Sequence, residues 1–149
     1  MNDNYNVEII NQRNDAYELI WNHNKEIERA ISDEELKRGI EKFIDKGNVI
    51  AVIKEEKIIV FMVLYCNSYD TLEAYICNLY VLEQYRRNHL ADKMIKKAIK
   101  ICEENHFVTI HLHVSEDNEP AVALYKKHGF SFTEEYRNAE RGMKLRLVK

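Results

Sequence analysis

The fold is decided by the stretch from Tyr75 to Ala91, which reads Tyr-Ile-Cys-Asn-Leu-Tyr-Val-Leu-Glu-Gln-Tyr-Arg-Arg-Asn-His-Leu-Ala. Its first half is rich in β-branched, aromatic and aliphatic residues, which predicts a strand, and its second half opens a basic amphipathic segment, which predicts a helix. Arg86 and Arg87 lie at the join. The backbone N–H groups at a helix start have no intrahelical partner, and the helix dipole is positive there, so the join favours an anion. The stretch therefore predicts a site for a phosphate-bearing cofactor.

The composition is that of a soluble globular protein. The chain has 149 residues, 46% of them hydrophobic and 32% charged, which excludes the disordered and membrane classes. The longest apolar run, Ile58 to Cys66, is too short to span a bilayer. Met1 to Asn6 lacks the basic start and apolar run of a secretion signal. We expect a single cytoplasmic domain over residues 1–149, with three reduced, buried cysteines and no thiolate metal site.

Charge is distributed unevenly along the chain. Met1 to Gly47 holds eleven Asp and Glu against seven Lys and Arg, whereas Gln84 to Lys100 holds six Lys and Arg against one Asp. The first region favours cations and the second favours anions, although a solvated helix face explains the acidic half equally well. With a net charge of −3 and no recognised nucleic-acid motif, nucleic acid is not an expected partner.

The pattern of apolar residues predicts a sheet flanked by helices. We expect strands at Val7–Ile10, Asn48–Lys54, Lys57–Cys66, Leu72–Leu82 and Phe107–Val114, then two more around a turn at Asn138–Gly142. We expect helices at Asp15–Glu28, from the capping box Ser32-Asp33-Glu34-Glu35 to Gly47, from Leu90 onward, and at Asn118–His128, closed by Gly129. The strand, helix and strand from Leu72 to Val114 require one parallel pair. The predicted class is therefore α+β, with a single mixed, mostly antiparallel sheet.

A second pattern lies in Asn118 to Phe130, which reads Asn-Glu-Pro-Ala-Val-Ala-Leu-Tyr-Lys-Lys-His-Gly-Phe. Asn118 is placed as an N-cap, and Ala121 and Tyr125 share a helix face. This Asn-x-x-Ala-x-x-Leu-Tyr-x-x-x-Gly-Phe pattern follows Val-x-x-x-Tyr-Arg and its helix, and together they resemble the GNAT superfamily of acyl-CoA-dependent N-acyltransferases. The resemblance covers Leu72 to Phe130 by motif and the first 47 residues by element order. It implies a three-layer α/β/α fold and acetyl-CoA as co-substrate, with no metal.

The resemblance assigns a cofactor site. The pyrophosphate loop of the family, Gln/Arg-x-x-Gly-x-Gly/Ala, falls on Arg86 to Ala91, with His89 in place of the central glycine and Arg87 at a position that is often glycine. Because a Cβ hinders the approach of backbone amides to an anion, His89 is expected to weaken the loop, and the two arginines to offset that loss. The implied cofactor residues are Leu79, Val81, Arg86, Arg87, Asn88, His89, Leu90, Ala91 and Asn118.

The resemblance also implies catalytic roles. Tyr125 would stand near the thioester sulfur and act as general acid, since a phenol can donate a proton at hydrogen-bond distance; a core tyrosine with a satisfied hydroxyl is the alternative. Glu73 would be the general base, although an exposed glutamate at a strand edge is an equally good explanation. His111 and His113 share one strand face and suit structural or substrate-lining roles better than zinc, and His113 can also serve as a proton relay.

The predicted function is direct transfer of an acetyl group from acetyl-CoA to a primary amine of a small molecule or peptide. The acidic N-terminal helices would rim the acceptor cleft, with Glu26, Glu28 and Asp33 to Glu35 as candidates. The alternative is a catalytically silent GNAT-like domain that binds acyl-CoA or another protein, as His89 and the absence of an obvious base suggest. The apolar, tyrosine-bearing strands near the C-terminus can also pair across a homodimer.

Overall fold

The structure, a computed structural model, describes residues 5–27 and 31–147. Its strands are Val7–Ile9 (β1), Asn48–Lys54 (β2), Lys57–Ser68 (β3), Glu73–Val81 (β4), Thr109–Val114 (β5), Ser131–Arg137 (β6) and Glu140–Arg146 (β7). Its helices are Ala16–Glu26 (α1), Asp33–Lys46 (α2), Leu90–Glu104 (α3) and Glu119–Lys127 (α4), with a 3₁₀ turn, η1, at Glu83–Tyr85. The predicted element order is confirmed.

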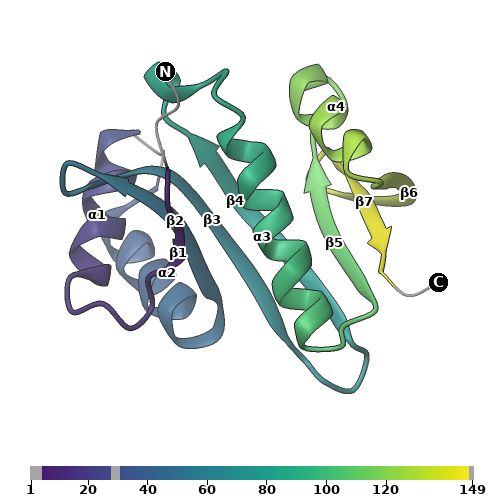
Figure 1. The fold of residues 1–149 in the computed structure, drawn as a ribbon, viewed down its shortest axis with the longest axis horizontal. Helices are drawn as coiled ribbons and strands as arrows, with labels where there is room; N and C mark the ends of the chain where they lie inside the picture. Colours follow the sequence, from purple (N-terminus) through teal and green to yellow (C-terminus); the bar gives the residue numbers. More distant parts are fainter. Residues whose placement is uncertain (1–4, 28–30, 148–149) are drawn as a thin grey trace.

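One mixed sheet carries the fold, in the strand order β1-β2-β3-β4-β5-β7-β6. All neighbouring strands are antiparallel except β4 and β5, which form the predicted parallel pair (Figure 1). One apolar cluster joins α3 and α4 to the sheet, and a second joins α1 and α2 to it. The sheet is therefore the middle of three layers, as predicted.

Local chemistry sets the ends of the elements. Ser32 caps α2 by accepting a hydrogen bond from the Glu35 amide at 3.2 Å, and its hydroxyl donates to the Glu35 carboxylate at 3.2 Å. The turn at Glu55 and Glu56 closes the β2–β3 hairpin with both residues at positive φ. The predicted turn at Asn138–Gly142 is too long, because β7 already begins at Glu140. No helix within the described residues is long and apolar enough to cross a bilayer.

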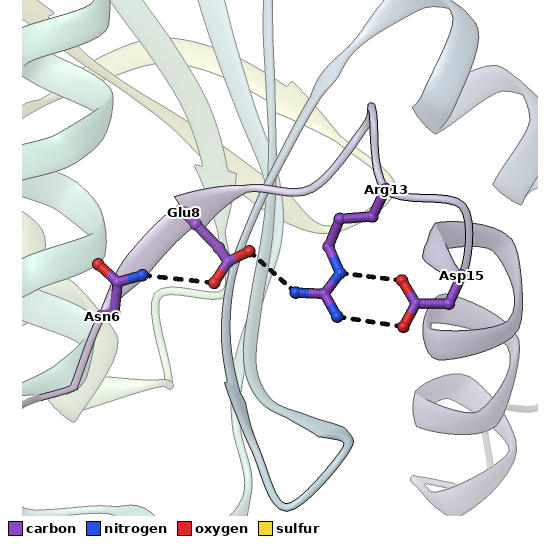
Figure 2. A network of polar contacts seen from close by, with 4 residues as sticks. All are labelled: Asn6, Glu8, Arg13 and Asp15. Carbon is purple, nitrogen blue, oxygen red and sulfur yellow. Dashed lines mark hydrogen bonds and ion pairs between the residues drawn. The ribbon is translucent and has the colours of Figure 1, made fainter.

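An exposed ion pair fixes the connection between β1 and α1. Arg13 donates to both carboxylate oxygens of Asp15, at 2.9 and 3.1 Å, and to Glu8 at 3.2 Å (Figure 2). These bonds hold the pKa of Asp15 below its usual value. Asp15 is the N-cap residue of α1 but makes no side-chain cap, which is consistent with the engagement of its carboxylate by Arg13.

The end of α4 positions Phe130 against Tyr125. Gly129 follows the helix with φ +97°, and the amide of Phe130 then bonds back to the carbonyl of Tyr125 at 3.0 Å. The rings of Phe130 and Tyr125 meet edge to face with centroids 5.9 Å apart. A glycine suits this position because side chains disfavour the left-handed region.

We therefore expect Gly129→Ala to lower the free energy of unfolding by about 1–2 kcal/mol, measured by urea denaturation. An added Cβ would also lie 3.1 Å from Leu145 Cδ1. Gly39→Ala is the matched control. Gly39 lies inside α2 with only the Phe43 ring within 4 Å of an added Cβ, so this change should stabilise the protein by about 0.5–1 kcal/mol. Equal effects of the two changes would contradict this account of Gly129.

Candidate functional site

The site begins where β4 and β5 part. They pair only from Glu73 to Tyr75 on β4, although both strands continue beyond that point. Figure 1 shows them diverging on either side of α3. A bulge in β4 coincides with the divergence: Cys77 pairs with Val63 and Tyr80 with Phe61, which leaves one extra residue near Asn78, whose φ is +59°. A bulge bends its strand, so this one favours the opening of the sheet.

The bulge also changes which residues face α3. Ala74 and Ile76 pack in the α3 cluster before it. After it, Val81 pairs with Val60 of the α3 cluster, whereas Tyr80 pairs with Phe61 of the α1 cluster. A side-chain period of two cannot produce that change without an extra residue. Leu79 and Val81, two of the predicted cofactor residues, therefore lie on the α3 side of the gap.

Three cavities meet at the bulge, and Leu79 lines all of them. The inter-strand cavity, of about 520 Å³, lies between β4 and β5 and is lined by Tyr75, Ile76, Cys77, Asn78, Leu79, Leu112, His113, Val114, Ser115, Asn118, Ala121, Tyr125, Arg137 and Glu140. The loop cavity, of about 670 Å³, is lined by Leu79, Tyr80, Val81, Tyr85, Arg86, Arg87, His89, Leu90, Ala91, Asp92, Asn118, Pro120, Ala121, Leu124 and Tyr125. The α1 cavity, of about 290 Å³, lies by His23, Asn24, Ile27, Phe61, Asn78, Leu79 and Tyr80.

The loop before α3 brings most of the predicted cofactor residues together. Arg86, Arg87, His89, Leu90 and Ala91 line the loop cavity. Arg87 and His89 both adopt positive φ, at 69° and 58°, which turns the chain abruptly into α3. His89 is the N-cap residue but makes no side-chain cap, and its side chain is 79% exposed. The first amides of α3 are therefore left uncapped by His89 and can donate to an anion.

Two loop residues are engaged within the protein. The Arg86 Nε donates to the carbonyl of Val81 at 2.9 Å, and the guanidinium lies over the Tyr80 ring at 5.3 Å. Asn88 donates to the carbonyl of Tyr85 at 3.0 Å and lines none of the three cavities. Asn88 thus shapes the loop, whereas Arg86 and Arg87 stand at the cavity wall.

Asn118 and Tyr125 come from α4 and line both the inter-strand and the loop cavity. Asn118 is the predicted N-cap, since its Oδ1 accepts from the amide of Ala121 at 3.3 Å. That bond leaves the Asn118 amide group free to donate. Tyr125 is 8% exposed, and burial, helped by the negative charge of Glu140, raises the pKa of Tyr125 to about 12. Its phenol therefore stays protonated at neutral pH.

Asp92 links α3 to α4, the two helices that border the loop cavity. Its carboxylate on α3 accepts from Lys127 at 3.0 Å and from His128 at 2.8 Å, both at the end of α4. Burial acts to raise the pKa of Asp92, but the hydrogen bonds from Lys127, His128 and His89 outweigh it and keep that pKa below its usual value. The charged cluster thereby fixes the position of α4, and of Tyr125, relative to the start of α3.

Sequence patterns alone did not find a chain of three bonded residues that spans four neighbouring strands, β4, β5, β7 and β6. The Tyr75 hydroxyl bonds Nδ1 of His113, and Nε2 of His113 bonds Glu135 Oε1 at 2.8 Å. A carboxylate only accepts, so Nε2 carries the proton and Nδ1 accepts from Tyr75. Arg137 donates to the oxygen of Tyr75 at 3.4 Å. His113 is 6% exposed, and both Tyr75 and His113 line the inter-strand cavity.

Gly142 lies beside the contact between Glu135 and His113. Gly142 on β7 pairs directly with His113, and β7 lies between β5 and β6. A Cβ on Gly142 would lie only 2.7 Å from Thr133 Oγ1, whereas its distance of 3.5 Å from Glu135 Oε1 would be an ordinary contact. The glycine thus avoids a clash with Thr133 at the position that Glu135 passes to bond His113.

The remaining predicted residues lie away from the cavities. Glu73 is half exposed, lies 3.7 Å from His111 and lines none of the three cavities. Of the acidic residues expected to rim the acceptor cleft, Glu26 pairs with Lys57 at 3.1 Å and Asp33 with Lys25 at 3.0 Å. Neither these two nor Glu34 and Glu35 line any of the three cavities described above, and Glu28 lies outside the described residues. Within the part of the chain that the structure describes, no group of three His, Cys, Asp or Glu residues could hold a metal ion.

Comparison with known proteins decides the family. A sequence model described as the acetyltransferase (GNAT) family matches residues 8–130. The chain belongs to this GNAT family. The resemblance noted at the helix join and at Asn118 to Phe130 is therefore confirmed.

Individual GNAT proteins resemble this chain in sequence or in fold. The N-alpha-acetyltransferase 50 of Danio rerio is 37% identical over 73 residues, 48% of this chain and 44% of that protein. An aminoglycoside 6'-acetyltransferase type Ii superposes with a TM-score of 0.81 at 13% identity, covering 97% of this chain and 98% of the other. A GNAT family acetyltransferase from Elizabethkingia anophelis, with acetyl-CoA bound, superposes with a TM-score of 0.71 at 17% identity, covering 98% and 100%. The matching segments span less than half the length of the curated relatives.

His89, the residue in place of the GNAT loop glycine, gives a direct test of the loop. Because φ is 58° there, His89→Gly should raise the free energy of unfolding by up to about 1 kcal/mol, and CoA should bind equally or more tightly in isothermal titration. His106→Gly is the matched control, since His106 has φ 62° at the far end of α3 and lines no cavity. It should gain similar stability without any change in CoA affinity. A large loss of affinity in His89→Gly alone would mean that the imidazole contacts the ligand.

Proposed function

We propose that the chain is an N-acetyltransferase that moves the acetyl group of acetyl-CoA directly to a primary amine of a small molecule or peptide. One observation carries the proposal: a proton donor, Tyr125, and a proton-accepting chain, Tyr75 to His113, line the same cavity from opposite faces of the sheet. Tyr125 packs in the cluster on the α3 side. Tyr75 pairs with Tyr65, which packs on the α1 side. The gap between β4 and β5 thus connects a cofactor face with an acceptor face.

The residues of the loop cavity fit coenzyme A. The uncapped amides at the start of α3 and the guanidinium groups of Arg86 and Arg87 suit the pyrophosphate. The free amide group of Asn118 and the wall around Leu79 suit the pantetheine arm, which reaches the inter-strand cavity. Bound there, acetyl-CoA supplies the acetyl group as a thioester.

Tyr125 is the general acid of the proposal. Tyr125 lines both cavities, and its hydroxyl stays protonated because its pKa is raised to about 12. It donates its proton to the sulfur as the thiolate leaves. Asp92 and its partners hold α4 and therefore keep this hydroxyl in place.

His113 is the general base of the proposal, acting through Tyr75. The acceptor amine gives a proton to the Tyr75 oxygen while the Tyr75 hydroxyl passes its own proton to Nδ1 of His113. Glu135 stabilises the resulting imidazolium and fixes its tautomer. We prefer this chain to Glu73, because Glu73 lines none of the three cavities.

The acid is tested by Tyr125→Phe. We expect turnover, followed by thiol release from acetyl-CoA over a panel of amines, to fall by about 10²–10⁴-fold, with acetyl-CoA affinity within about threefold of wild type. Tyr69→Phe is the control, since Tyr69 is exposed and lines no cavity. Because the pKa of Tyr125 is raised, its deprotonation should not reduce the wild-type rate below about pH 10. An unchanged rate in Tyr125→Phe would exclude Tyr125 as the general acid. Tight binding of acetyl-CoA by the wild-type protein without any turnover would instead favour a catalytically silent domain.

The base is tested by His113→Gln. It should lower kcat/KM for the amine by about 10²-fold or more. The kcat/KM of His111→Gln should stay near wild type, because His111 is on the same strand but lines none of the three cavities. The kcat/KM of Glu135→Gln should lie between those of the two histidine variants, because a neutral amide still accepts from Nε2 of His113 but stabilises the imidazolium less. If Glu73→Gln lowers kcat/KM for the amine more than His113→Gln does, the base is Glu73.

A further inference from the structure

The inter-strand cavity has a single carboxylate among its lining residues, Glu140. Glu140 opens β7 directly after the turn at Asn138 and Ala139, which have φ of 49° and 68°. Two successive left-handed residues make a two-residue hairpin, and Glu140 pairs across it with Arg137. The turn therefore sets a negative and a positive side chain side by side at the cavity wall.

The two charges are not equivalent. Arg137 is held against Tyr75, with a hydrogen bond of 3.4 Å to the hydroxyl and its guanidinium carbon 5.6 Å from the ring centroid. Glu140 pairs with Arg137 through the backbone ladder, but within residues 5–27 and 31–147 its carboxylate makes no hydrogen bond or ion pair. The carboxylates on α1 and α2 that the sequence put at the acceptor cleft lie elsewhere, and Glu26 and Asp33 are already paired with lysines. Glu140 is thus the negative charge that this cavity offers to a ligand.

An acceptor amine carries the complementary charge. A primary amine has a pKa of about 10 and enters at neutral pH as an ammonium ion. We propose that Glu140 anchors the positive charge of the acceptor, so that the substrate class is a cationic amine bound between the β6–β7 turn and Tyr125. This inference rests on the proposed function and adds a residue for acceptor recognition to it.

The test uses two probes that cannot be acetylated on a primary amine and that differ in charge, n-butylguanidinium and n-butylurea. Each is titrated into the protein saturated with CoA, and binding is followed by NMR chemical shifts. Wild type should prefer the cation by about tenfold, as expected for one partly exposed charge pair. Glu140→Gln should lose that preference, and Glu140→Asp should keep part of it.

Glu134→Gln is the matched control, because Glu134 is a fully exposed carboxylate of the same hairpin that lines none of the three cavities. It should retain the wild-type preference. For an amine that wild type acetylates, Glu140→Gln should raise KM about tenfold with a smaller change in kcat and unchanged affinity for acetyl-CoA. An equal affinity of wild type for both probes, or a preference that survives in Glu140→Gln, overturns the inference. Failure of the proposed function would appear separately, as no acetyl-CoA binding or no thiol release with any amine.

Discussion

The interruption of pairing between β4 and β5 is the constraint on which the rest of the structure depends. Parallel strands joined by a helix normally stay paired and covered on both faces. Here the hydrogen bonds stop after Tyr75, and an extra residue near Asn78 bends β4 away. The unpaired edges leave the sheet open at its centre, and the main-chain groups along them must find partners in a ligand or in water. The inter-strand and loop cavities both follow from this opening.

At this opening the two faces of the sheet present different groups. On one face, α3 and α4 are joined through Asp92, and they present the anion-binding loop together with Asn118 and Tyr125. On the other face, Tyr75 and His113 follow the alternation of their strands and meet across the parting pair. The proposed transfer would pass through this gap and uses no covalent enzyme intermediate.

Much of this arrangement could be predicted from local sequence. The cap at Asn118, the left-handed Gly129 and the spacing of Ala121 and Tyr125 each depend on residues within one turn of helix, so they were predictable. The join at Arg86 and Arg87 was predictable for the same reason. His89 was read only as a missing glycine; the structure adds that its backbone is left-handed and its side chain points largely to solvent. Glu73 shows what local sequence could not predict. Its position on a strand did not reveal that it lies where β4 and β5 are still paired.

The sequence by itself determined the class of fold and the order of elements, because both rest on periodicity or on neighbours in the chain. It also predicted an anion-binding join, and the family resemblance added Tyr125 as a candidate acid. Only the tertiary structure decided which groups line the inter-strand cavity. Tyr75 and His113 are 38 residues apart and meet because β4 and β5 are parallel neighbours. Glu135 lies on β6, on the far side of β7, and bonds His113 past Gly142 of β7. Strand order and register are set by packing of the whole sheet, so no local pattern could predict that Glu135 bonds His113 or that Glu140 lines the inter-strand cavity.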